Sequence, residues 1–184
     1  MAEDTVICHG APTLAGIKSG NLFPCPYESE AELLAEIRRM NRILAPKGLE
    51  LIPARYGTDG RALLYLYRRR ALARDLEDAR ARALLEQAGY CTRSCTVCVA
   101  QLIRRLRSGE GFPHEVGLFL SYPPEDVAGF LTQGPQGAKC VGTWRVYGDV
   151  DRAQRIFQRY RACTARYRLR WSRGARLDQL VVPS

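Results

Sequence analysis

Two short polar segments contain the residues that could carry out nucleophilic or acid–base chemistry. Cys8 and His9 are adjacent near the start of the chain, and His114 and Glu115 form a second pair far along it. A thiolate is a nucleophile, an imidazole can act as its base, and a carboxylate such as Glu115 or Asp126 can orient that imidazole. These residues predict a small thiol-dependent enzyme or a redox protein, provided that Cys8 and His114 meet in space.

The surroundings of Cys8 leave other interpretations open. Residues 8–26 are rich in Gly, Pro and Ser, so we expect an irregular segment with one short helical turn over residues 12–18. Cys8 would then stand at the head of a helix, where the helix dipole stabilises a thiolate. Alternatively Cys8 packs against a sheet and His9 caps a turn. A Cys-His pair could also bind haem or a metal ion, so a haem- or iron-handling protein is a further hypothesis, although no cofactor follows from the sequence.

A second group of cysteines has a spacing known from metal sites. Cys91, Cys95 and Cys98 follow the pattern C-x3-C-x2-C, which in radical S-adenosylmethionine enzymes supplies three thiolates to an iron–sulfur cluster. The 86 residues after Cys98 are too few for the barrel of those enzymes. Cys95 and Cys98 also fall on one apolar helical stripe with Leu102 and Leu106, which favours a place in the core over a metal site. We therefore expect no metal site. If the chain does bind a metal ion, Cys91, Cys95 and Cys98 are weak candidates for its ligands.

The positive charge is concentrated in the last part of the chain. The formal net charge is +9, and from Arg152 onwards there are nine arginines and one acid, Asp178. Apolar residues recur here at helical spacing, which predicts a long basic C-terminal helix. At about 100° per residue, one flank of that helix carries Arg152, Arg155, Arg159, Arg166, Arg170 and Arg173, and the other flank carries Arg161 and Arg168.

This arginine stripe predicts a non-catalytic binding protein as an alternative to an enzyme. Arg152, Arg155 and Arg159 could hold an anionic ligand, an acidic protein or the phosphates of nucleic acid. Lys18, followed by Ser-Gly-Asn, could supply a second anion-binding edge, and Tyr122 is a further candidate binding residue. No helix-turn-helix, zinc-finger or RNA-binding signature accompanies the charge, which makes nucleic acid the less favoured partner. A solvated helix flank without a ligand also explains the arginines.

The elements that must position these residues can be read from periodicity and turn signals. We expect strands over residues 49–55, 62–68, 116–120 and 138–147, the first two joined as a β-hairpin. We expect helices opening at Ser29, over residues 74–88 and 94–107, after Pro123, and from Arg152 onwards. This order predicts an α/β or α+β fold in which helices pack on a small sheet of about four strands. No linker or repeat divides the chain, so residues 1–184 are expected to form a single domain.

Composition sets the broad class and the expected location. The chain of 184 residues is 46% hydrophobic and 26% charged, as in ordinary globular proteins. No apolar run approaches the length of about 20 residues that a membrane span needs. The beginning, Met-Ala-Glu-Asp, is acidic where a signal peptide would be basic, so we expect a cytoplasmic protein whose seven cysteines are free.

Three stretches together resemble an uncharacterised bacterial family, the domain of unknown function thirty-seven ninety-three. They are CHGAPTLAGIK from Cys8, FPHEVGLFLSYPPEDV from Phe112 and GTWRVYGD from Gly142. The family pattern has glycine where Ser121 stands and a tyrosine-like residue near Thr143, and it includes positions matching Cys98 and Cys163 but not Cys91 or Cys95. The resemblance implies no established activity. It draws attention to the polar residues of the motifs, which are Cys8, His9, Thr13, Lys18, His114, Glu115, Tyr122 and Asp126.

Overall fold

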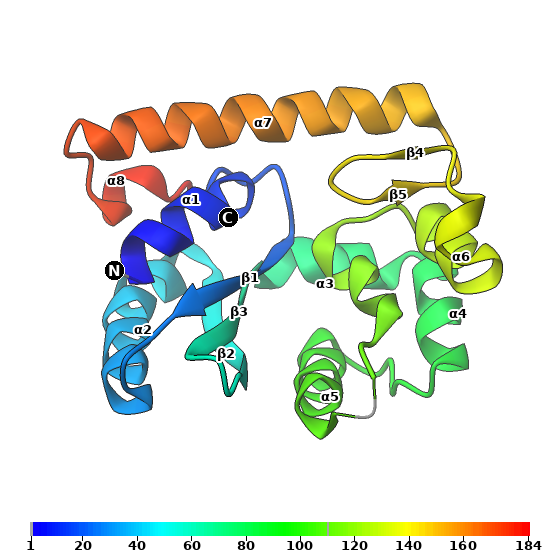
Figure 1. Ribbon diagram of the computed structural model, residues 1–184, viewed down its shortest axis with the longest axis horizontal. Coiled ribbons are helices and arrows are strands. Elements are labelled where there is room, and N and C mark those ends of the chain that lie inside the picture. Colours follow the sequence, from blue (N-terminus) through cyan, green and yellow to red (C-terminus); the bar gives the residue numbers. More distant parts are fainter. Residues whose placement is uncertain (1, 110) are drawn as a thin grey trace. The chain divides into compact units, whose positions relative to one another are not determined.

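The computed structural model describes residues 2–109 and 111–184, which group into two compact units. Unit 1 comprises Met1–Ala71 and Ala162–Ser184, and unit 2 comprises Leu72–Arg161. The fold is mixed α+β, with a three-stranded antiparallel sheet and a separate two-stranded ribbon. Each unit is described in turn, and Figure 1 gives the labels of the elements.

Unit 1 is built on a three-stranded antiparallel sheet with the order β1-β3-β2. Phe23 pairs with Leu64 and Leu51 with Leu66, so the apolar residues of all three strands share one face. The hairpin between β2 and β3 confirms the expected pairing of the two central segments. The strands are β1 (Gly20–Pro26), β2 (Leu49–Tyr56) and β3 (Arg61–Arg68).

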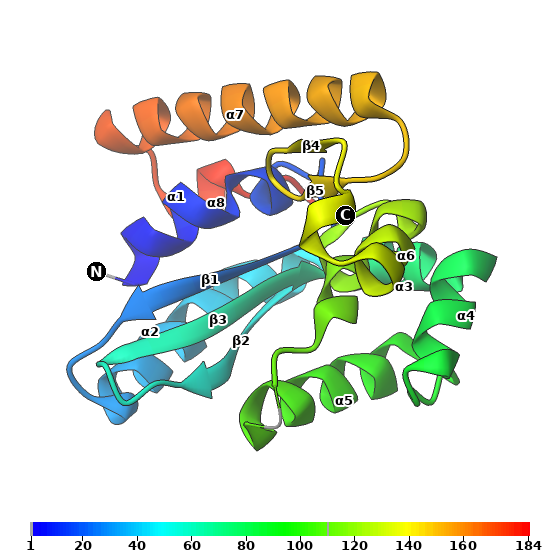
Figure 2. The ribbon, with the colours of Figure 1, turned by 45° about the vertical axis from the view of Figure 1, so that its right-hand side comes forward.

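Helices cover the apolar face of this sheet. α1 contacts β1 and β3, and α2 contacts β2, as can be followed in Figure 2. Ser29 caps α2 by accepting a hydrogen bond from the Glu32 backbone at 3.3 Å, as the sequence predicted. The core contains Ile7 and Leu14 of α1 and Met40 of α2, each almost fully buried. The helical elements are α1 (Ala2–Leu14), α2 (Glu30–Leu44), the 3-10 turn η1 (Ala45–Lys47) and α8 (Leu177–Leu180).

The prediction of an irregular segment over residues 8–26 is wrong. The first part belongs to α1, which runs to Leu14 with Pro12 inside it, and the last part is strand β1. Gly10 explains why a glycine stands within this helix. A Cβ added there would lie 2.6 Å from Leu66 Cδ2, so only glycine lets the helix approach β3 so closely.

Unit 2 contains short helices and one small ribbon of two strands. Where one helix was expected over residues 74–88 there are two, because Asp78 accepts hydrogen bonds from the Arg80 and Ala81 backbones and starts a new helix. The helical elements are α3 (Arg69–Glu77), α4 (Ala79–Gln87), α5 (Cys95–Ser108), the 3-10 helix η2 (His114–Leu120), α6 (Pro124–Gln133) and the 3-10 turn η3 (Pro135–Gly137). The first residues of α3 belong to unit 1. The strands of the ribbon are β4 (Cys140–Val141) and β5 (Arg145–Val146).

Two strand predictions in unit 2 are wrong. Residues 116–120 lie in the 3-10 helix η2. Ser121, directly after it, has a φ of 57°, in the left-handed region that favours glycine. Residues 138–147 form only the two-residue strands β4 and β5. The expected sheet of about four strands is thus replaced by a three-stranded sheet and a separate two-stranded ribbon.

The long helix expected after Arg152 corresponds to α7 (Val150–Ser172), a continuous helix of 23 residues visible in Figure 1. Phe157 packs edge-on against Trp144 at 4.5 Å, which anchors the first half of α7 in unit 2. In unit 1, Trp171 donates a hydrogen bond from its indole to Asp4 at 2.9 Å. Among the helices of the described residues, none combines the length and the apolar character that a membrane span requires.

Candidate functional site

Cys8 and His9 lie on α1, in a setting different from the expected one. Cys8 is in the middle of the helix, partly exposed, with its sulfur 3.9 Å from Asp4 Oδ1. It is therefore not at a helix start, and the dipole effect invoked for its thiolate does not apply there. His9 is exposed and stacks on Phe23 with ring centroids 5.6 Å apart.

Lys18 is buried rather than placed on a solvated edge. It lies between α1 and β1, and its exposed fraction is 5%. Burial lowers the pKa of Lys18 to about 8, because the charged amine is desolvated. Thr13, near the end of α1, is fully buried and donates a hydrogen bond to Asn21 at 2.7 Å. This hydrogen bond therefore links the end of α1 to the start of β1.

Arg68, which the sequence analysis did not single out, is the central polar residue of unit 1. It projects from the core face of β3, and its guanidinium donates to the carbonyls of Thr13 at 2.5 Å and Leu14 at 2.7 Å, at the C-terminal end of α1. It also donates to Val182 O at 2.7 Å and to the Ser184 hydroxyl at 3.1 Å. Burial lowers the pKa of Arg68. Arg68 is the last residue of a strand, and the sequence pattern of that strand does not indicate these long-range contacts.

Unit 2 brings His114 and Glu115 to the wall of a pocket, together with Arg105 of α5. Glu115 is buried, with an exposed fraction of 7%, and accepts hydrogen bonds from Tyr90 Oη at 2.9 Å and Arg105 Nη1 at 3.1 Å. The Arg105 guanidinium also lies 4.2 Å from the centre of the Tyr90 ring and donates to Ala88 O at 2.5 Å. Burial and the neighbouring Glu115 carboxylate raise the pKa of Tyr90, so the tyrosine stays a donor.

The pocket itself has a volume of about 630 Å³ and a mixed lining. His114 is exposed at its wall, with its ring 4.8 Å from Phe130 and 6.1 Å from Phe112. The lining includes Arg104, Arg105, Ser108, Phe112, His114 and Leu131. Cationic and apolar side chains thus face the same space.

Asp126 has a structural role that the sequence analysis did not foresee. This carboxylate is buried and accepts three hydrogen bonds of 2.7 Å, from Trp144 Nε1 and from the backbones of Tyr147 and Gly148. Both of its oxygens are engaged, so Asp126 fastens the β5 end of the ribbon to α6. Tyr122 lies beside it, with its ring 5.0 Å from Trp144 and its hydroxyl donating to Thr143 O at 3.3 Å.

The cysteines near α5 are positioned as structural residues. Cys98 is buried, and its sulfur lies 3.6 Å from Cys91 O. Cys95 begins α5, and burial raises its pKa to about 11. Burial also raises the pKa of Cys98. Within residues 2–109 and 111–184, no group of three or more His, Cys, Asp or Glu side chains is arranged to hold a metal ion.

The arginines of α7 are all exposed. Arg152 lies 3.9 Å from the Glu125 carboxylate, and Arg170 donates to Gln179 O at 3.1 Å. Arg155, Arg159 and Arg166 form no ion pair with any other residue that the structure describes. These guanidinium groups are therefore available to an anionic partner.

Of the residues singled out from the sequence, His114 and Glu115 share one site, Asp126 and Tyr122 meet around Trp144, and Cys8, His9 and Lys18 belong to unit 1. A meeting of Cys8 with His114 stays a prediction, because the two residues belong to different units.

The fold and these sites define a small α+β protein with an arginine-rich helix and a polar pocket. The chain belongs to the family described as Protein of unknown function (DUF3793), which matches residues 6–181. No curated protein and no solved structure matches the chain.

Proposed function

We propose that the protein binds the phosphate backbone of double-stranded nucleic acid through one flank of α7, without catalysis. That flank, called the arginine face below, consists of Arg152, Arg155 and Arg159 in unit 2. The observation that carries the proposal is that all three are exposed on one helix and that Asp151 is the only acidic residue of that helix.

The spacing of the arginine face suits a row of phosphates. At about 100° per residue the three side chains fall within about 60° of one another around the helix axis. The rise of about 1.5 Å per residue separates Arg152 from Arg159 by about 10 Å along that axis. This part of the helix can thus present three guanidinium groups at once, and each can donate two parallel hydrogen bonds to a phosphate.

The composition of α7 favours nucleic acid over an acidic protein. Stable protein interfaces have an apolar or aromatic centre. Among the described residues of α7, Leu169 is the one exposed large apolar side chain, while Phe157, Tyr160 and Tyr167 are buried. Trp171 is the one aromatic residue of α7 that is partly exposed, and its indole is bonded to Asp4. One such ring disfavours single strands, which bind by stacking on several aromatic side chains. The cytoplasmic location expected from the sequence would give access to nucleic acid.

A thiol-dependent enzyme or redox protein at Cys8 has less support. The thiolate argument required a helix start at Cys8, and α1 begins at Ala2. A haem- or iron-handling role for Cys8 and His9 would involve one partly exposed thiol and an imidazole stacked on Phe23. Both hypotheses are tested by thiol labelling and by an absorption spectrum with metal analysis of the purified protein.

The proposal is tested by fluorescence anisotropy with a labelled duplex of 25 base pairs. Three phosphate contacts predict a slope of about −2.7 in a plot of log K against log salt, or roughly a 40-fold loss of affinity from 50 to 200 mM salt. Unlabelled duplexes of unrelated sequence should compete equally, because backbone contacts carry no base information. A protein that leaves the duplex free at 50 mM salt contradicts the proposal.

A matched pair of variants separates the arginine face from general positive charge. The double variant Arg155→Gln/Arg159→Gln should flatten the salt slope by about 2. The control Arg161→Gln/Arg168→Gln removes the same charge from the opposite flank of α7 and should leave the slope within error of wild type. Equal effects of the two variants would overturn the proposal, as would polyglutamate competing as well as the duplex, which indicates an acidic protein partner.

A further inference from the structure

The pocket beside η2 shares no residue with the arginine face, and its chemistry is different. Two parts of its lining face one space: a cationic part on α5 and an apolar part formed by Phe112 and Leu131. We propose that this pocket binds a small organic anion, a carboxylate or a phosphate monoester, that carries a flat apolar body.

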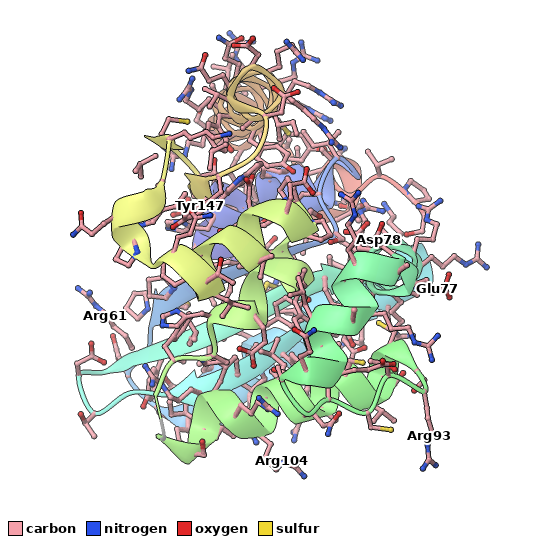
Figure 3. The ribbon with its side chains drawn as sticks, turned by 90° about the vertical axis from the view of Figure 1, so that its right-hand side faces the viewer. Arg61, Glu77, Asp78, Arg93, Arg104 and Tyr147 are labelled. Atoms are coloured by element: carbon pink, nitrogen blue, oxygen red, sulfur yellow. The ribbon has the colours of Figure 1, made fainter. Side chains whose placement is uncertain are left out.

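The cationic part has one fixed guanidinium group and one available guanidinium group. Arg105 is held by Glu115, by the Ala88 carbonyl and by the ring of Tyr90. Its charge neutralises the buried Glu115 carboxylate, so Glu115 does not repel an incoming anion. Arg104, the next residue, is exposed and projects from α5 in Figure 3. It forms no ion pair within the described part of the chain. Arg104 is therefore the group that takes the acid of the ligand.

The apolar part supplies a surface for the body of the ligand. Phe112 is 50% exposed and Leu131 is 45% exposed, and both line this pocket. They are two of the six exposed large apolar side chains among the described residues. The His114 ring lies near Phe112 and Phe130, tilted by 59° and 55° to their rings, and adds to this surface. Exposed apolar side chains beside a few convergent polar groups are typical of ligand sites.

The two parts together define the ligand class. A guanidinium group binds carboxylate and phosphate oxygens in the same bidentate way, so the structure assigns the acid group without distinguishing these two. A purely inorganic anion would leave Phe112 and Leu131 uncovered, and a neutral aromatic molecule would leave Arg104 without a partner. An anion with an aromatic body satisfies both parts of the lining.

The test uses three probes that share one aromatic body: 2-naphthoate, 2-naphthyl phosphate and neutral 2-naphthalenemethanol. Titration of the full chain by isothermal calorimetry, with amide chemical shifts to locate the site, should show binding of at least one anion and at least tenfold weaker binding of the alcohol. The preferred anion then tells carboxylate from phosphate. Absence of binding by both anions at 5 mM probe, or equal binding of the alcohol, overturns the proposal.

Variants on exposed side chains keep the test free of folding effects. Arg104→Gln should weaken binding of the preferred anion about tenfold, as expected for the loss of a hydrogen bond to a charged group. Phe112→Ala should weaken the anion and the alcohol alike. Arg93→Gln, an exposed arginine of unit 2 outside the pocket lining, is the matched control and should bind as wild type. If Arg104→Gln also binds as wild type, the assignment is wrong. Because none of these residues belongs to α7, a failure here leaves the duplex measurement unaffected.

Discussion

Arg105 and Glu115 form a partly buried ion pair, with 3.1 Å between Nη1 and Oε1, that joins α5 to the start of η2. The whole side chain of Glu115 is 9% exposed and that of Arg105 is 35% exposed, so the pair borders solvent mainly on the arginine side. Tyr90 completes the arrangement by donating to the same oxygen of Glu115. The wall of the pocket is therefore fixed by contacts among residues that are distant in sequence.

Replacement of Arg105 by alanine should destabilise the protein. It removes one of the two donors to the buried Glu115 carboxylate, leaving Tyr90 as the other, and it removes the hydrogen bond to the Ala88 carbonyl. We expect a loss of about 1–3 kcal/mol in the free energy of unfolding, measured in urea. Arg104→Ala, an exposed neighbour on the same helix, is the control and should change that free energy by less than about 0.5 kcal/mol. Equal stability of the two variants would show that the pair contributes nothing.

Arg68 should be more sensitive still, because its guanidinium group contacts two separate segments. The Arg68→Met variant keeps the apolar stem but leaves the carbonyls of Thr13, Leu14 and Val182 without this donor. We expect a destabilisation of about 2–4 kcal/mol in urea. Hydrogen exchange should show faster opening at the end of α1 and at residues 181–184 than elsewhere in unit 1. Arg68→Lys should not restore stability, since an ammonium group cannot span these acceptors.

Capping and turn residues in the sequence correctly predicted the elements whose ends are set by residues adjacent in the chain. The cap at Ser29 located α2, and the turn between the two central segments located the hairpin of β2 and β3. Segment β1 was missed because its prolines, Pro24 and Pro26, are unusual in strands. The order β1-β3-β2 makes it an edge strand, where proline is tolerated.

The elements that were predicted wrongly depend on tertiary packing. The buried face of helix α1 includes Gly10, Ala11 and Pro12, which are small or poor helix formers, so its apolar periodicity is weak in the sequence. The apolar run after Glu115 is as compatible with a short helix as with a strand. It forms the 3-10 helix η2, whose residues are buried, and that choice depends on tertiary packing. The roles of Arg68 and Arg105 could not be predicted, because each depends on acceptors from distant parts of the chain.

A methyl group added at Gly142 should destabilise the protein. A Cβ at this position would lie 2.1 Å from the ring of Phe157, a residue of α7 that packs against Trp144 in unit 2. We expect Gly142→Ala to cost about 1–3 kcal/mol in the free energy of unfolding. The double variant Gly142→Ala/Phe157→Leu makes room for the methyl group, so it should lose less than the sum of the two single variants. Additive losses would mean that the two residues are not in contact.

The stability of the protein should rise with pH above about 8 because of Lys18. Burial lowers the pKa of this amine from 10.5 to about 8 in the folded chain. Between these two pH values the unfolded chain binds a proton that the folded chain has released, so the free energy of unfolding increases with pH. Below about pH 8 the amine is charged in both states, and the folded state bears the cost of burying that charge.

The size and origin of this pH dependence can be measured with one variant. The shift of Lys18 corresponds to a gain of about 3 kcal/mol between pH 8 and pH 10.5. Other groups titrate in the same range, so the quantity to compare is the difference between wild type and Lys18→Met in urea unfolding at each pH. That difference should be constant below pH 7.5 and should shift in favour of wild type as the pH approaches 10.5. A difference that stays constant over the whole range would show that Lys18 has the same proton affinity in the folded and unfolded chains.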